Sequence, residues 1–304
     1  MITLTMVPLF FSIGLSLVAR PLTSHMHPRA AVVLLTVTAL SAALCTGLAF
    51  GVCGVLAVGQ WDPVSDLGRW SQATLRQQSE FPVDLGVVAF VVMIVCLSSA
   101  MRRGLRSLRE LRYLSLAARD LTPATAQLVV VDDAEAIAYA VPGRGGRVVV
   151  STSMLKALSS TERRVLIAHE FAHLDGRHYA YRHLVRLAAA ANPLLRPVVR
   201  AVDFGLERWA DEVAVQRTGS RSVVARALTN AALLTTRRPM HALAANGADV
   251  LARVDALSLP PLRRRPILLG VVLAAALCCW LAAGGLAVWG DTIVQHAEIS
   301  WAHS

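Results

Sequence analysis

Two histidines and a glutamate stand at a spacing that lets them act on one metal ion. They lie in the segment His169-Glu170-Phe171-Ala172-His173, a His-Glu-x-x-His pattern. On a helix, residues four apart lie on the same face, so both imidazoles can bind one ion. Glu170 is then placed to take a proton from a metal-bound water molecule. The pattern predicts a zinc site with hydrolytic chemistry.

A catalytic zinc ion needs a third protein ligand and one open position. Glu207 and Asp211 lie one helical turn apart further along the chain. We expect Glu207 to complete the coordination, and Asp211 to accept the second N–H of a ligand histidine. The break at Asn192-Pro193 would let two helices fold back antiparallel and bring Glu207 opposite the histidines. In the alternative interpretation, both acids belong to an ordinary solvated helix face.

Two helices must position these residues. A capping box of Ser159 and Glu162 marks the start of a helix predicted over about 161–190, which carries the histidines. A second helix, predicted over about 198–217 and closed by Gly219, carries the two downstream acids. The candidate ligands therefore lie on regular elements that can hold them in a fixed geometry.

Short strands are expected before the histidine helix, and more helices after the acidic one. The strands are predicted at 128–131, 137–141 and 147–150, with a glycine-rich turn at 142–146 and further helices within 221–258. An exposed edge at 147–150 would align an extended peptide by adding a strand. The region is thus predicted to be an α+β domain.

The composition places much of the chain in a membrane. Of its 304 residues 55% are hydrophobic and only 16% charged, and the mean hydropathy is +0.53, whereas soluble domains are about a quarter charged. Four apolar stretches approach the length of about 20 residues that a membrane-spanning helix needs: 1–19, 30–59, 85–101 and 267–290. The segment 103–118 predicts a basic amphipathic helix, which either lies on the membrane surface or continues the third span.

The net charge of +10 comes almost entirely from arginines. We find no basic recognition helix, so direct binding of nucleic acid is not expected. The arginines flank the apolar stretches, as at Arg102, Arg103 and Arg263–Arg265. By the positive-inside rule, 102–266 faces the cytoplasm, while the N-terminus, the 60–84 loop and the C-terminus lie outside.

The motifs together resemble a known family. His169 to Leu174, followed by Glu207 to Glu212 between a third and a fourth span, is similar to the membrane metallopeptidases of the BlaR/MecR type. These are beta-lactam sensor-transducers and their shorter relatives. Actinobacterial members look especially similar, through Arg177-His178 and the Ala-Asn-Pro-Leu-Leu segment at 191–195. The resemblance implies that His169, His173 and Glu207 bind zinc and that Glu170 is the catalytic base.

This interpretation gives a definite fold and domain organisation. We expect a multi-pass α-helical membrane protein with a cytoplasmic α+β, zincin-like (gluzincin) metallopeptidase domain, located in a bacterial plasma membrane. The expected parts are three transmembrane helices in 1–101, the peptidase domain in 102–266, the fourth span in 267–290 and a short extracellular tail in 291–304. The sensor-transducers carry a penicillin-binding domain after the last span. The sequence lacks one, so direct beta-lactam sensing is not expected. We interpret the Ser-x-x-Lys pattern of Ser153 and Lys156 as a strand-to-helix connection.

The expected activity is hydrolysis of peptide bonds by zinc-activated water. The resemblance implies regulated cleavage of a cytoplasmic repressor in signal transduction, with a protein substrate and the lipid bilayer as partners. One alternative is a quality-control or processing protease like the HtpX or CAAX enzymes. Another is a non-catalytic membrane transducer that zinc only braces. Arg177 and His178 are candidates for contacts to the oxyanion or substrate; a structural role or contact with phospholipid headgroups is the alternative.

Overall fold

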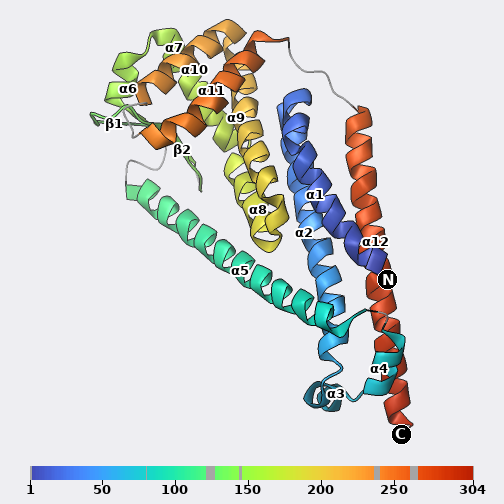
Figure 1. The fold of residues 1–304 in the computed structure, drawn as a ribbon. Helices are drawn as coiled ribbons and strands as arrows, with labels where there is room; N and C mark the ends of the chain where they lie inside the picture. Colours follow the sequence, from blue (N-terminus) through green and yellow to red (C-terminus); the bar gives the residue numbers. More distant parts are fainter. Residues whose placement is uncertain are drawn as a thin grey trace.

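A bundle of long helices carries a smaller α+β domain at one end (Figure 1). The computed structural model describes residues 2–79, 81–120, 127–143, 146–235, 240–260 and 266–303. Part of the predicted glycine-rich turn, at 144–145, and the basic triplet at 263–265 lie outside these residues.

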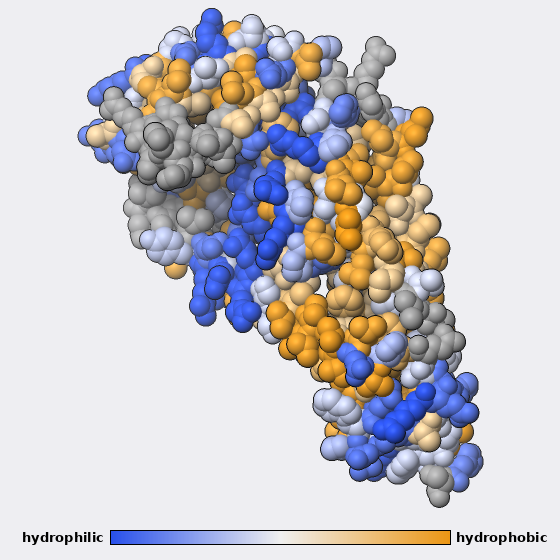
Figure 2. Space-filling view, viewed as in Figure 1, coloured by the Kyte–Doolittle hydropathy of each residue, from blue (hydrophilic) through white to orange (hydrophobic). Residues whose placement is uncertain are grey.

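Among the described residues, four helices are long and apolar enough to cross a membrane, in agreement with the four predicted stretches. They are α1 (Ile2–His25), α2 (Pro28–Val58), α5 (Val83–Asp120) and α12 (Pro266–Ala302). Figure 2 shows hydrophobic side chains gathered along this part of the molecule, with hydrophilic surface at both ends. The length of α5 decides between the two interpretations of 103–118, because this basic segment continues the third apolar helix without a break.

Helices α2 and α5 touch through glycines. A Cβ atom at Gly86 would lie 2.5 Å from the Cβ of Ala57 and 2.8 Å from the carbonyl oxygen of Cys53. At Gly54 it would lie 2.6 Å from the ring of Phe90. Small residues at such crossings let helix backbones approach closely, which favours packing between apolar helices. The two helices are thus held as one unit.

The 60–84 segment lies at the end of the bundle away from the α+β domain (Figure 1). It forms two short helices, α3 (Asp62–Gly68) and α4 (Gln72–Gln78), of which α4 packs against the last turns of α12. The backbone N–H of Ser71 donates to the carbonyl oxygen of Ala297 at 2.9 Å. The segment and the end of α12 therefore share one end of the molecule, as the predicted topology requires.

The sheet has three strands, β1 (Leu128–Val131), β2 (Ala138–Val141) and β3 (Arg147–Ser151), in the order β1-β3-β2. Strand β3 pairs parallel with β1 and antiparallel with β2. The predicted free edge at 147–150 is therefore wrong. Val148, Val149 and Val150 are apolar on both faces and fully buried, so this strand takes the centre of the sheet. The outer strand that packs against the histidine helix is β2.

Seven further helical segments complete the domain: α6 (Thr152–Ala157), α7 (Ser160–Asp175), α8 (His178–Ala191), η1 (Pro193–Leu195), α9 (Arg196–Thr218), α10 (Arg221–Thr235) and α11 (Met240–Ser258). The predicted capping box at the start of α7 is present, and α9 ends at Gly219, which has a positive φ of 77°. The single helix predicted over 161–190 is wrong. The chain breaks at Gly176 and Arg177, where Arg177 takes a left-handed conformation with φ 50° and α8 starts in a new direction.

Helices α8 and α9 form a hairpin that packs directly on α1 and α2. At its tip the Asn192 amide donates to the hydroxyls of Ser12 at 2.9 Å and Thr46 at 3.2 Å. Behind the tip, Leu195, Val198 and other side chains of the hairpin share one buried cluster with both apolar helices. The α+β domain is thus continuous with the helical bundle, and this packing fixes the position of α9.

Candidate metal centre

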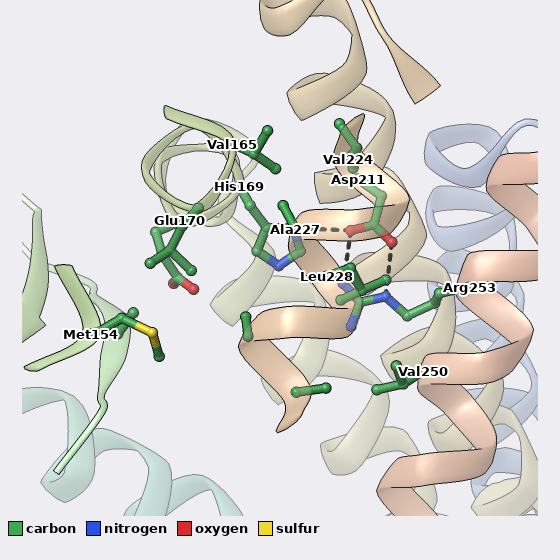
Figure 3. Close-up of a pocket in the computed structure, with 14 residues that line it drawn as sticks. Met154, Val165, His169, Glu170, Asp211, Val224, Ala227, Leu228, Val250 and Arg253 are labelled. Carbon is green, nitrogen blue, oxygen red and sulfur yellow. Dashed lines mark hydrogen bonds and ion pairs between the residues drawn. The ribbon is translucent and has the colours of Figure 1, made fainter. Parts of the chain in front are cut away.

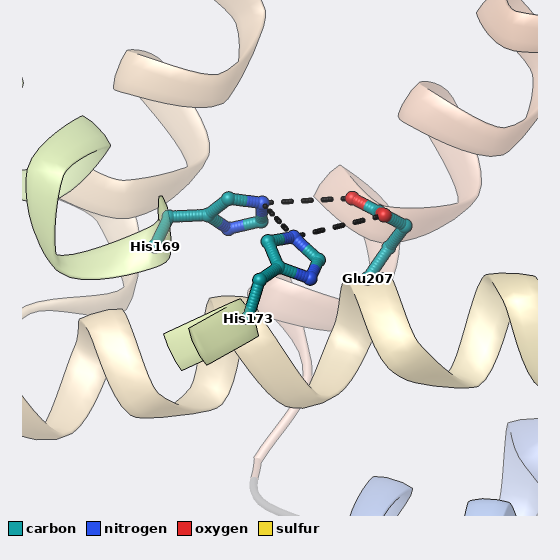
Figure 4. Close-up of side chains that lie close together, drawn as sticks. All are labelled: His169, His173 and Glu207. Atoms are coloured by element: carbon teal, nitrogen blue, oxygen red, sulfur yellow. Dashed lines mark hydrogen bonds and ion pairs between the residues drawn. The ribbon is translucent and has the colours of Figure 1, made fainter. Parts of the chain in front are cut away.

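Three side chains from two helices converge on one point (Figure 4). His169 and His173 come from α7 and Glu207 from α9, and their ligand atoms all lie within 4.8 Å of one another. The two Nε2 atoms are 3.2 Å apart, and they lie 3.5 and 3.8 Å from the Glu207 carboxylate oxygens. In a tetrahedral site with bonds of about 2.0–2.1 Å, ligand atoms are about 3.3–3.4 Å apart. The three residues therefore fit a zinc ion.

The packing of α9 explains why Glu207 reaches this point. Gly205 lies against α2, where a Cβ atom would come within 2.8 Å of the Val32 side chain. Leu206 and Ala210 are fully buried, and Leu206 packs in the cluster that α9 shares with α1 and α2. These contacts leave Glu207 facing α7, as the sequence predicts. Asp211 follows one turn later and is buried, so the two acids do not form a solvated helix face.

Asp211 holds the outer nitrogen of His169. The Nδ1 of that ring lies 3.1 Å from a carboxylate oxygen of Asp211, so Nε2 is left to face the metal position. Arg253, from α11, donates to both oxygens of the same carboxylate at 2.8 and 2.7 Å (Figure 3). Burial raises the pKa of Asp211, but the Arg253 charge and hydrogen bonds outweigh burial and leave the pKa below its usual value. Asp211 is therefore an anion and accepts the His169 N–H.

Glu207 is also held by arginines. Arg253 places its Nη1 3.3 Å from one carboxylate oxygen, and Arg182 from α8 places its Nη2 3.2 Å from the other. Burial raises the pKa of Glu207, but the neighbouring histidines and Arg253 hold it well below the usual range. The sequence prediction missed both arginines. No short spacing links either of them to the motif, so nothing in the pattern could have found them.

The two ligand histidines differ in their protonation. Burial lowers the pKa of His169, but hydrogen bonds to Asp211 and Glu207 raise it to about 10. Burial lowers the pKa of His173 to about 3. Without a metal ion, His169 is therefore protonated on both nitrogens and positively charged at neutral pH, while His173 is neutral. A metal ion that binds both rings must displace a proton from His169.

The two other predicted contacts lie in different places. His178 is buried behind His173, with the Nδ1 atoms of the two rings 2.8 Å apart, so it faces the ligand and not the reaction site. Burial lowers the pKa of His178 to about 4. Arg177, at the break before α8, lines a separate cavity with Arg29 and Trp209. The break, which the sequence did not reveal, determines both positions.

Glu170 lines a cavity of about 230 Å³ together with His169, Asp211 and Arg253 (Figure 3). The rest of the wall is apolar and is formed mainly by Met154, Val165, Leu166, Val224, Leu228 and Val250. Burial raises the pKa of Glu170 above its usual value, which brings the carboxylate closer to the range of an effective general base. The cavity thus places a candidate base and space for an apolar group beside His169, one of the three candidate ligands.

This arrangement of a His-His-Glu group, a neighbouring carboxylate and four candidate spans is typical of a membrane-associated metallopeptidase. The comparison with protein families agrees: residues 108–239 match the sequence model of Peptidase family M48. The match runs from the last part of α5 through α10 and covers all three candidate ligands, Glu170 and Asp211. Arg253 lies beyond it. No curated protein and no solved structure matches the chain.

Proposed function

We propose that the protein is a zinc metalloendopeptidase with a zincin-like domain. The observation that carries this proposal is the convergence of His169, His173 and Glu207, where His169 also lines the cavity that contains Glu170. Zinc, when bound there, supplies a Lewis acid and an acidified water molecule. Glu170 accepts a proton at its carboxylate and returns it to the leaving amine.

The surroundings of the site fit an extended peptide. Among the described residues, strand β2 is an outer strand of the sheet, and its Ala140 backbone interacts with the Glu170 carboxylate, so a peptide paired with its outer side would lie beside Glu170. Ala138 of β2 lines the cavity beside Glu170. A peptide on this edge would place an apolar side chain in the cavity next to the bond that is cleaved.

The site favours catalysis over a purely structural metal. A structural zinc site is closed by a fourth protein ligand, and it needs no base. Here the group consists of three ligands within the part of the chain that the structure describes, and Glu170 stands next to it. A non-catalytic transducer that zinc only braces would have no use for either feature.

For location and substrate, we propose a bacterial plasma membrane with the domain on the cytoplasmic side, which is the side that the arginines favour. The resemblance to the BlaR/MecR type supports a cytoplasmic repressor as the substrate. A quality-control or processing role, as in HtpX or CAAX enzymes, has its own support. The α8–α9 hairpin packs on α1 and α2 and holds the metal centre close to the apolar helices, where membrane-protein substrates would lie.

The test uses the full chain in lipid nanodiscs, with a quenched-fluorescence peptide library as substrate. Glu170→Gln should abolish cleavage while the bound zinc, measured by mass spectrometry of the metal, stays unchanged. Glu298→Gln, an exposed change near the end of α12, is the matched control and should cleave normally. Full activity of Glu170→Gln would exclude the mechanism. Comparing cleavage of a repressor with that of an unfolded membrane protein then separates the two substrate classes.

A further inference from the structure

We propose that His178 is a positioning residue for the metal: its Nδ1 accepts a hydrogen bond from the Nδ1 of His173 and fixes that ring with Nε2 towards the ion. The inference rests on the proposed zinc site. It assigns to the second ligand histidine the support that Asp211 gives to the first.

The two ligand histidines are held in parallel ways. Both Nε2 atoms face the shared space beside Glu207 (Figure 4). Each Nδ1 points away from that space to a buried partner, His169 to Asp211 at 3.1 Å and His173 to His178 at 2.8 Å. Groups that accept the outer N–H of a ligand histidine fix its tautomer and the orientation of its ring.

The metal sets the direction of the hydrogen bond between the two rings. A neutral imidazole that binds a metal through Nε2 carries its hydrogen on Nδ1. His173 must then be the donor, so His178 accepts at Nδ1 and carries its own hydrogen on Nε2. In the opposite tautomer, the Nε2 of His173 would carry a hydrogen and could not bind the ion. With the metal bound, His178 therefore accepts from His173 and holds its ring in the form that binds the ion.

The position of His178 leaves one of its ring nitrogens buried without a hydrogen-bond partner in the described part of the chain. Its side chain is only 1% exposed, and its Nε2 has no hydrogen-bond partner within the described part of the chain. A buried polar atom without a partner is unfavourable, so it calls for an explanation. The contact at the other nitrogen supplies one, because a ring committed to His173 cannot turn to satisfy both atoms.

The surrounding backbone leaves room for this ring and little else. A Cβ atom at Gly176 would lie 2.4 Å from the Nε2 and 2.6 Å from the Cδ2 of His178. On another side, the ring of Trp209 lies with its centroid 4.6 Å away. The left-handed Arg177 turns the chain so that His178 comes back against α7. The break between α7 and α8 therefore serves to aim His178 at His173.

The experiment measures zinc affinity of the full chain in nanodiscs by competition with a chromogenic chelator, and the absorption spectrum of the cobalt-substituted protein. His178→Leu should weaken zinc binding by about 10–100-fold and change the cobalt bands. His178→Asn places an amide oxygen near the position of Nδ1 and should restore most of the affinity. Gly176→Ala removes no polar atom but displaces the ring, so it should weaken binding as His178→Leu does.

The matched control is His183→Ala, which removes a histidine from the next turns of the same helix and should bind zinc normally. Equal affinities for wild type, His178→Leu and Gly176→Ala would overturn the inference while the proposed function stands. If His178→Leu does not fold, the zinc affinities of His178→Asn and Gly176→Ala test the inference. Weak zinc binding by His178→Asn together with normal zinc binding by Gly176→Ala would overturn it. A wild-type protein that binds no zinc would instead overturn the proposed function.

Discussion

Arg253 on α11 donates two hydrogen bonds to Asp211 on α9 and at the same time lies 3.3 Å from Glu207. One guanidinium thus joins the carboxylate that supports His169 to the carboxylate that is the third candidate ligand. Both acids would repel each other if they were left unpaired, since Asp211 is buried and Glu207 is half-buried. Arg253 makes their close approach possible.

Replacing Arg253 by methionine should therefore destabilise the protein and weaken zinc binding. Removing one partner of a buried ion pair leaves an uncompensated charge and costs about 3–5 kcal/mol. Thermal unfolding in detergent, with and without zinc, measures the effect. Arg253→Lys keeps the charge but not the two parallel hydrogen bonds, so it should fall between wild type and methionine. Wild-type stability of Arg253→Met would contradict this account of the centre.

Glu207→Gln should lower zinc affinity, because it replaces a charged ligand by a neutral amide. The metal content after dialysis against a weak chelator is the measurement. Asp203→Asn is the matched control: Asp203 lies one turn earlier on α9 and pairs with Arg182 and Arg186. This variant should keep its zinc. If both variants lose zinc equally, the loss of local charge would explain the result, and the ligand role of Glu207 would be excluded.

Zinc affinity should rise with pH through the neutral range. In the metal-free protein the pKa of His169 is raised to about 10, so zinc binding displaces a proton from this ring. The zinc affinity should therefore increase by up to about tenfold for each pH unit below that pKa. The same shift affects stability. Without metal, the contribution of His169 is complete below its unfolded value of about 6.5 and is lost as the pH rises through about 10.

Calorimetric titration with zinc in buffers of different ionisation enthalpy counts the released protons. Asp211→Asn weakens the main hydrogen bond that raises the pKa of His169, so it should release fewer protons at pH 8 than wild type. A pH-independent affinity between pH 6.5 and 9 would contradict the protonated state of the metal-free centre.

Asn192→Ala should destabilise the junction between the domain and the bundle. The substitution removes hydrogen bonds to Ser12 and Thr46 and the cap on the N–H of Leu194. We expect a loss of about 1–3 kcal/mol in unfolding free energy. Ser24→Ala removes an exposed hydroxyl from α1 and serves as the control. An unchanged melting temperature of Asn192→Ala would show that apolar packing alone holds the hairpin in place.

The sequence predicted the parts of the site that depend on local spacing. Two histidines four apart on a helix must share a face, so their convergence needed no tertiary information. The position of Glu207 opposite the histidines could also be predicted, because Asn192 and Pro193 mark where the chain turns back. The four apolar helices could be predicted for a similar reason, since the length and composition of a continuous segment are visible in the sequence.

The rest depends on contacts between distant segments. Arg253 comes from another helix, and no spacing relates it to Asp211. For His178 the sequence left open a contact to the oxyanion or substrate and a structural role, because its position depends on the break at Gly176 and Arg177, which local spacing does not reveal. The edge strand was misplaced for the same kind of reason. Strand order follows from which segments pair, and the short run at 147–150 does not reveal that it pairs on both sides.

The hydrogen bond from Asn192 to Ser12 has a consequence for biosynthesis. These residues are 180 positions apart, and the ribosome releases α1 and α2 long before the α8–α9 hairpin exists. Until the hairpin forms, the surface around Val32 and Leu35 is not covered by α8 and α9, which bury it in the folded protein. The first two helices are thus synthesised without their final neighbours, and the α+β domain, synthesised later, completes the packing of the helical bundle as it folds.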